Sequence, residues 1–135
     1  MSQNKLVKAK QSFSKFLKLG AKESLNLEAQ YFLSTIAIRQ QEIGKAEEML
    51  QSILDRDPRF ERAIILMGDI ANFRGNESKA KERWRKALDV INKKLNQIER
   101  KLSGKVQLED LGELRSEKER LSRTKKQLTE KLSEL

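Results

Sequence analysis

The stretch that decides the fold is residues 27–60, LEAQYFLSTIAIRQQEIGKAEEMLQSILDRDPRF. It is followed directly by residues 61–94, ERAIILMGDIANFRGNESKAKERWRKALDVINKK. A shift of 34 residues lays the second segment over the first. Apolar and small residues then coincide: Leu33 with Met67, Ser34 with Gly68, Ala37 with Ala71, Ala46 with Ala80, Leu50 with Trp84 and Ile53 with Ala87. A repeat of this length predicts helix pairs that stack, because one pair alone cannot bury its apolar face.

The composition agrees with a nearly all-helical chain and excludes several kinds of chemistry. Hydrophobic residues make up 37% and charged residues 36% of the 135 positions, which suits a thin helical protein with much surface per residue. The chain has neither cysteine nor histidine. Disulfides, thiol nucleophiles, thiolate or imidazole metal sites and histidine acid–base catalysis are therefore excluded. We expect a protein that is not an enzyme, with no cofactor and no small-molecule substrate.

The charge is unevenly distributed along the chain. The formal net charge is +9, with +5 in residues 1–24, −3 in 25–58, +3 in 59–92 and +4 in 93–135. The positive charge therefore lies mainly at the two ends, and the first repeat is acidic. Such a distribution can attract an acidic protein, RNA or an anionic membrane surface.

Helix-period spacing and breaker residues predict the individual helices. The expected helices cover residues 5–19, 26–41, 45–55, 59–73, about 78–102 and about 107–133. The breaks between them fall at Gly20, Gly44, Asp57-Pro58, Arg74-Gly75-Asn76 and Ser103-Gly104-Lys105. The long helix continues past Asn92, where the preceding repeat has its proline, because apolar residues still recur at heptad spacing.

The last two helices are predicted to pair as a long antiparallel hairpin over 78–135. Folding the chain about Gly104 brings apolar residues together along a seam, whose members are Leu88, Ile91, Leu95, Ile98, Leu102, Leu108, Leu111, Leu114 and Leu121. Leucines at 114, 121, 128 and 135 also suggest a zipper between two chains, although Lys118 and Lys125 in the alternate positions cost such a dimer stability. Pairing between chains, which would give a homo-oligomer, and a frayed polar tail are the two alternatives.

The first predicted helix, residues 5–19, has three interpretations. Its apolar face is flanked by lysines, as in a membrane-surface helix. It has no acidic residue before Glu23, as in an organelle-targeting peptide. The Ala9 and Phe13 spacing instead favours the second helix of a half repeat over 5–20, and we prefer this interpretation.

The 34-residue unit resembles the tetratricopeptide repeat (TPR) family. The residues that carry the resemblance are Ile64, Met67, Gly68, Ala71, Ala80, Trp84 and Ala87 in the second unit and Leu33, Ser34, Ala37, Ala46, Leu50, Ile53 and Pro58 in the first. Gln30, Ala37 and Ala71 depart from the family pattern, which has large or aromatic residues there. The resemblance implies an all-α fold: a short solenoid of helix pairs over 1–94, extended by the hairpin. A plain helical bundle is the alternative.

The resemblance also implies a binding groove, because the first helix of each TPR unit lines the concave face. The positions transferred by spacing are Glu28, Tyr31, Thr35, Ile38, Arg39, Arg62, Ile65, Asp69, Asn72 and Phe73. Tyr31 and Phe73 are the expected anchors, because aromatic side chains supply contact area at low entropic cost. Tyr31 and Thr35 stand where chaperone-binding members have Lys and Asn, so we do not expect that family's carboxylate clamp.

These observations favour an adaptor, scaffold or assembly factor that binds a protein segment and docks on a larger complex. The alternatives are an RNA or ribonucleoprotein binder that uses the basic ends and a membrane-peripheral scaffold that uses residues 5–19. No apolar run is long enough for a transmembrane helix, and the first residues lack a secretory signal. We therefore expect a cytoplasmic protein, or one soluble in its compartment of synthesis.

Overall fold

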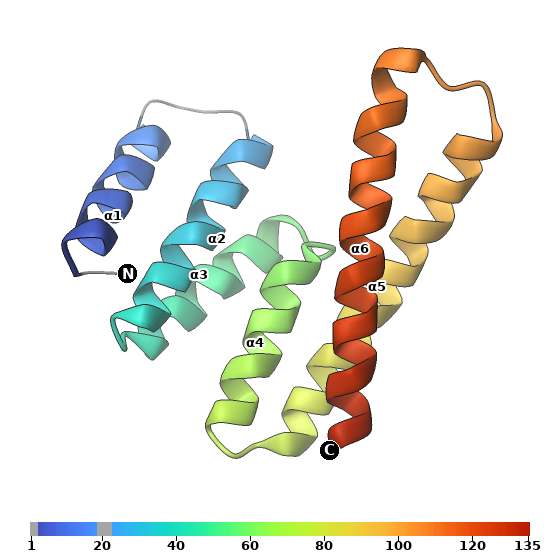
Figure 1. The fold of residues 1–135 in the computed structure, drawn as a ribbon. Coiled ribbons are helices and arrows are strands. Elements are labelled where there is room, and N and C mark those ends of the chain that lie inside the picture. The colour runs from blue at the N-terminus through green and yellow to red at the C-terminus, as the bar shows by residue number, and fades with distance from the viewer. Residues whose placement is uncertain (1–2, 19–22) are drawn as a thin grey trace.

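A computed structural model shows an all-α protein and describes residues 3–18 and 23–135 (Figure 1). Its helices are α1 (Gln3–Lys18), α2 (Glu23–Arg39), α3 (Ile43–Arg56), α4 (Glu61–Phe73), α5 (Glu77–Ser103) and α6 (Leu108–Glu134). The predicted helices agree with these bounds to within a few residues. The predicted break at Gly20 and the side chain of Phe13 lie outside the described part.

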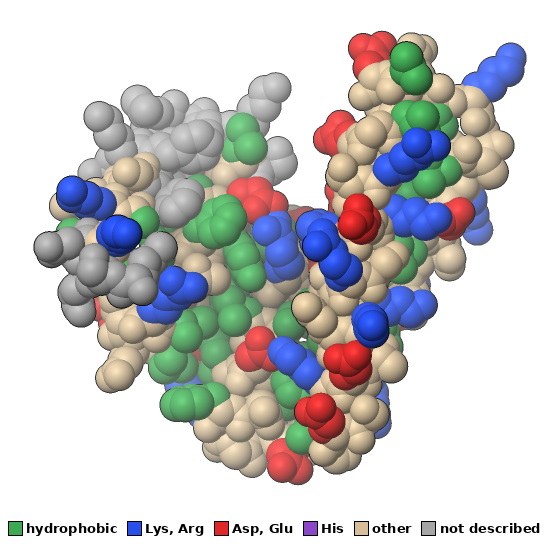
Figure 2. Space-filling view, viewed as in Figure 1, with side chains coloured by type: hydrophobic (Ala, Val, Ile, Leu, Met, Phe, Trp, Pro, Cys, Tyr) green, Lys and Arg blue, Asp and Glu red, His purple; other side chains and the backbone are tan. Residues whose placement is uncertain are grey.

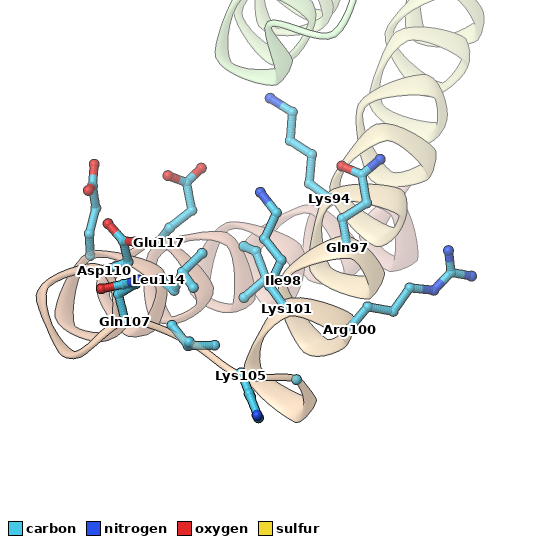
Figure 3. A pocket seen from close by; sticks show the side chains of 13 residues that line it. Lys94, Gln97, Ile98, Arg100, Lys101, Lys105, Gln107, Asp110, Leu114 and Glu117 are labelled. Atoms are coloured by element: carbon cyan, nitrogen blue, oxygen red, sulfur yellow. The ribbon is translucent and has the colours of Figure 1, made fainter.

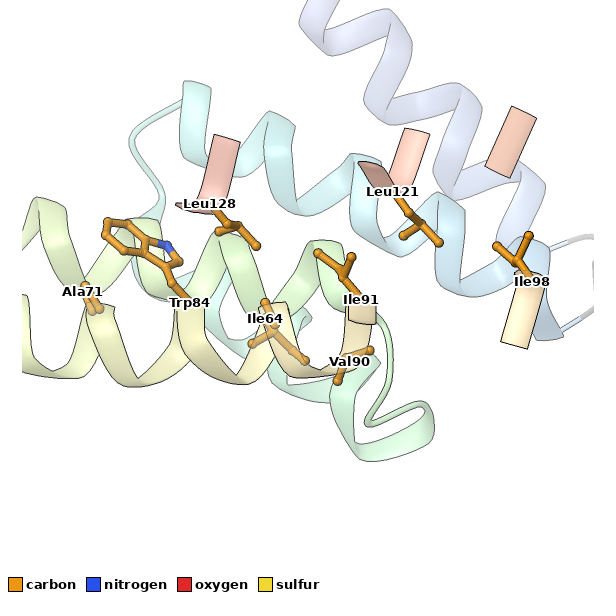
Figure 4. Packing of buried hydrophobic residues seen from close by; sticks show 10 residues of the cluster. Ile64, Ala71, Trp84, Val90, Ile91, Ile98, Leu121 and Leu128 are labelled. Carbon is orange, nitrogen blue, oxygen red and sulfur yellow. The ribbon is translucent and has the colours of Figure 1, made fainter. Parts of the chain in front are cut away.

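Neighbouring helices pack in chain order, α1 on α2, α2 on α3, α3 on α4, α4 on α5 and α5 on α6. The α5–α6 hairpin closes within the chain and its turn end projects past the other helices (Figure 1). One hydrophobic cluster joins α2, α3 and α4, and a second joins α4, α5 and α6 around Trp84, Ile91, Leu121 and Leu128 (Figure 4).

The turns of the two helix pairs have the same geometry. The Glu42 N–H donates to the Ala37 carbonyl at 2.8 Å, and the Asn76 N–H, 34 residues later, donates to the Ala71 carbonyl at 2.9 Å. Gln41 and Gly75 occupy the same left-handed position, with φ of 63° and 81°. Such an αL residue lets a helix end in a Schellman turn. The repeat in the sequence is therefore also a repeat in the backbone.

Small residues set the distance between the helices of each pair. Ala46, Ala80 and Ala87 are fully buried, as is Ser34, which aligns with Gly68. A Cβ on Gly68 would lie 2.5 Å from two atoms of the Trp84 ring, so α4 can approach α5 this closely only with glycine at 68.

The seam of the hairpin is partly as predicted. Ile91, Ile98 and Leu121 are buried, and Leu95, Leu102 and Leu114 pack against them. The prediction for Leu108 is wrong, because its side chain is 88% exposed. Leu108 is the first residue of α6 and shares the outer stripe of that helix with Arg115, so Leu111 and Leu114 face α5 instead. Leu88 and Leu111 are half-buried.

Gly112→Ala is expected to stabilise the protein by about 0.5–1 kcal/mol, because glycine inside a helix costs about that much relative to alanine. Gly112 lies in the second turn of α6, and a Cβ there would meet no atom within 4 Å. Urea denaturation followed by circular dichroism measures the change. A lower unfolding midpoint for the variant would contradict the expectation.

Candidate functional site

A hollow lies beside the α5–α6 hairpin, with Lys, Arg, Asp and Glu side chains at its base and hydrophobic side chains gathered on the surface beside and below it (Figure 2). The start of α4 forms its floor. A cleft of about 610 Å³ here is lined by apolar residues Leu25, Leu27 and Phe60 together with charged groups of α2, α4, α5 and α6. We call the surface formed by Glu28, Tyr31, Phe32, Arg62 and Phe73 the α2–α4 face.

Side-chain contacts hold α2 and α4 together at this face. The Arg62 guanidinium lies 4.8 Å from the centre of the Tyr31 ring and 4.9 Å from that of Phe60, and it forms an ion pair with Glu28. The two rings lie 5.8 Å apart. Burial raises the pKa of the Tyr31 hydroxyl, although Arg62 opposes this shift. Three predicted groove residues, Glu28, Tyr31 and Arg62, thus form one contact cluster together with Phe60.

The exposed aromatic residues differ in part from the predicted anchors. Phe73, at the end of α4, is 79% exposed, which makes it available to a partner. Tyr31 is half-buried under Arg62, whereas its neighbour Phe32, whose ring centre lies 5.8 Å away, is 41% exposed. Sequence reasoning missed Phe32. The spacing held no signal that separates the two, because Tyr31 and Phe32 follow Glu28 by three and four residues and both share its side of the helix.

The remaining predicted groove residues serve different roles. Thr35 donates its hydroxyl hydrogen to the Phe32 carbonyl at 2.7 Å, which binds it to its own helix. Ile38 and Ile65 are half-buried and pack on the two hydrophobic clusters. Arg39 and Asn72 are exposed.

The carboxylate of Asp69 is bound by side chains of α5 and α6. It accepts hydrogen bonds from the Trp84 indole N–H at 3.1 Å and from the Lys131 ammonium at 3.0 Å. Lys131 also lies 5.4 Å from the centre of the Trp84 ring. The C-terminal half of α6 therefore covers one end of the predicted groove, and α4 contributes only Arg62 and Phe73 to the α2–α4 face.

A buried carboxylate at the other end of α4 was also missed. Glu61 is only 3% exposed, and it accepts from Lys94 of α5 at 2.6 Å and from Arg120 of α6 at 3.0 Å. Burial opposes its ionisation, but Lys94 and Arg120 outweigh burial and hold the pKa of Glu61 below its ordinary value. The 34-residue alignment contained a signal here, because it places Glu61 at the core position of Leu27.

Burial lowers the pKa of Arg120, but the charges of Glu61 and Glu117 outweigh it and raise that pKa. Ion pairs thus join Glu61, Lys94, Glu117 and Arg120 in one network. It fastens the N-terminal half of α6 to the rest of the protein, as Asp69 and Lys131 fasten the other half.

The geometry provides surfaces for contact with another molecule. Within the described residues, no cluster of acidic side chains could hold a metal ion. None of the helices in this part of the chain combines the length and apolar character needed to cross a bilayer. No model of a known protein family matches the chain, and no curated protein is significantly similar to it in sequence.

Proposed function

We propose that the protein is a non-enzymatic, TPR-like adaptor. It holds a segment of another protein on the α2–α4 face and docks on a larger assembly through its C-terminal hairpin. The observation that carries this proposal is the exposure of Phe32 on α2 and of Phe73 at the end of α4. Large aromatic side chains exposed at a protein surface are characteristic of binding anchors, since they desolvate on contact without much loss of side-chain entropy.

The rigidity of the surroundings supports the same function. The contacts of Arg62 with Tyr31 and Phe60 fix the position of α2 relative to α4. The helices that carry Phe32 and Phe73 are therefore held in place before a partner binds. A preorganised surface binds more tightly, because little entropy is lost when the partner arrives. The equivalent turns and buried small residues of the two helix pairs support the TPR-like part of the proposal.

Photo-crosslinking tests the proposal. Benzoylphenylalanine replaces Phe73 or Phe32 in the full chain, and replaces Glu82, an exposed residue of α5, in the control. After irradiation in native extract, we expect one defined protein to be attached at 73 and 32 but not at 82. The same protein should be attached when the extract is treated with nuclease or brought to high salt before irradiation, because the contact is mainly apolar.

Two outcomes would contradict the adaptor function. Equal labelling at position 82 would show that the α2–α4 face is not selective. Adducts that no longer form when nuclease or salt is added before irradiation would favour the RNA-binding alternative, since phosphate contacts weaken steeply as salt rises.

A further inference from the structure

The burial of the α5–α6 hairpin changes along its length. Near the body, Ile91, Leu121 and Leu128 are at most 1% exposed, and Ile64 of α4 packs against the same cluster. Towards the turn, Ile98 is still buried, at 6% exposed, but Leu95, Leu102 and Leu114 of the same seam are only half-buried. The difference arises because α4 supplies a third helix at one end and nothing supplies one at the other. The turn half has the apolar seam of a bundle with one helix missing.

A groove marks the place of the missing helix. It has a volume of about 780 Å³ and lies between α5 and α6, with Ile98, Val106 and Leu114 as its apolar lining (Figure 3). Lys94, Glu113 and Glu117 line both this groove and the cleft beside the α2–α4 face. The two hollows are therefore continuous, and we call the portion between α5 and α6 the hairpin groove.

The two walls of the hairpin groove have opposite charge. Lys101 comes from α5, whereas the side chain of Arg100 points away from α6 (Figure 3). Asp110 and Glu113 come from α6. In the described part of the chain, none of Lys101, Asp110 and Glu113 forms an ion pair. Their charges are available to an incoming segment.

We propose that the hairpin groove takes an amphipathic helix of the partner, with basic side chains on one flank of its apolar stripe and acidic side chains on the other. This helix would complete a three-helix bundle with α5 and α6. Its basic flank lies along Asp110 and Glu113, and its acidic flank lies along Lys101. The inference rests on the proposed adaptor function and adds the chemistry of the partner and a second part of its binding site.

Three labelled model peptides test the proposal against the full-length protein. Each is a helix of about three heptads with leucine at the inward positions. One has Lys on one flank and Glu on the other, the second has Lys on both flanks, and the third has Glu on both. Fluorescence anisotropy at nanomolar peptide and physiological salt gives each Kd. We expect the mixed peptide to bind at least about ten-fold more tightly than either of the others, since like charges face each other in the mismatched complexes.

Charge reversal of one wall should change the preference predictably. Asp110→Lys with Glu113→Lys makes both walls basic, and this protein should prefer the peptide with two Glu flanks. Lys101→Glu replaces the basic charge of the α5 wall with an acidic one, and that protein should prefer two Lys flanks. The control for the α6-wall variant is Glu130→Lys with Glu134→Lys, which changes the net charge by the same amount on exposed residues of the far end of α6. This control should keep the preference of the unmodified protein.

Absence of binding by all three peptides would overturn the proposal, and so would a preference that follows the net charge in the control. Either result concerns the hairpin groove alone. Crosslinking from Phe32 and Phe73 would still decide the adaptor function separately, because those residues lie on α2 and α4.

Discussion

Gly68→Ala is expected to lower the free energy of unfolding by about 2 kcal/mol, because overpacking a close-packed core costs roughly 1–3 kcal/mol and more than offsets the better helix propensity of alanine. The added Cβ would lie 2.5 Å from Trp84 Cδ1 and Nε1 and 3.2 Å from Arg83 Cβ. The Trp84 ring is buried and its N–H is bonded to Asp69, so it cannot move away without loss of that bond.

Urea denaturation of the two proteins measures this difference, and Gly112→Ala is the matched control. Both glycines lie inside helices, but only Gly68 has a neighbour within 4 Å of the added carbon. The two substitutions should therefore change stability in opposite directions. If Gly68→Ala were neutral, the close approach of α4 to α5 would not depend on the absence of a side chain at 68.

Glu61→Ala is expected to cost about 3 kcal/mol, near the lower end of what removal of one partner from a buried ion pair costs. The lower end applies because Lys94 and Arg120 are partly exposed and can turn towards water. The N-terminal half of α6 should loosen as a consequence. Hydrogen exchange should then show faster exchange of the α6 amides near Arg120 than in the unmodified protein.

The control for this prediction is Glu99→Ala. Glu99 pairs with Lys118 between α5 and α6, but both side chains are well exposed. Removal of an exposed pair changes stability by about 0.5 kcal/mol or less. An equal cost for the two substitutions would contradict the role assigned to Glu61.

The same carboxylate should make stability depend on pH. The pKa of Glu61 is lower in the folded protein than its ordinary value of 4.5, so folding favours the ionised form. This contribution is complete above about pH 4.5 and is lost as the pH falls through the folded-state pKa. Urea denaturation at pH 7 and pH 3 should therefore show a smaller acid-induced loss for Glu61→Gln than for the unmodified protein.

Much of the fold followed from sequence pattern, because helix periodicity and the few breaking residues are local signals. The break before Leu108 was predicted from Ser103-Gly104-Lys105, and the continuation of α5 past Asn92 was predicted from heptad spacing. The attachment of α6 to α4 was not. A heptad pattern shows that one face is apolar, but it does not show which further helix covers that face. The contacts that decide this, Asp69 with Lys131 and Glu61 with Arg120, join residues far apart in the chain.

The candidate site was predicted only in part for a similar reason. The spacing placed α2 and α4 on one surface and identified Phe73. It did not separate Tyr31 from Phe32, because adjacent residues differ by about 100° around a helix and the exposed one depends on how α1 and α4 flank α2. The charge contrast between the walls of the hairpin groove was visible in the sequence, but its significance required the paired arrangement of α5 and α6.

The unbroken course of α5 has a mechanical consequence. This helix runs through both the second repeat and the hairpin over 27 residues, with no glycine or proline between its ends. A helix of that length spans about 40 Å and bends little where no residue interrupts its hydrogen bonds. The helix therefore fixes the distance between the body of the protein and the hairpin turn. Two partner molecules bound at opposite ends of α5 would be held at a separation set by the number of residues in the helix.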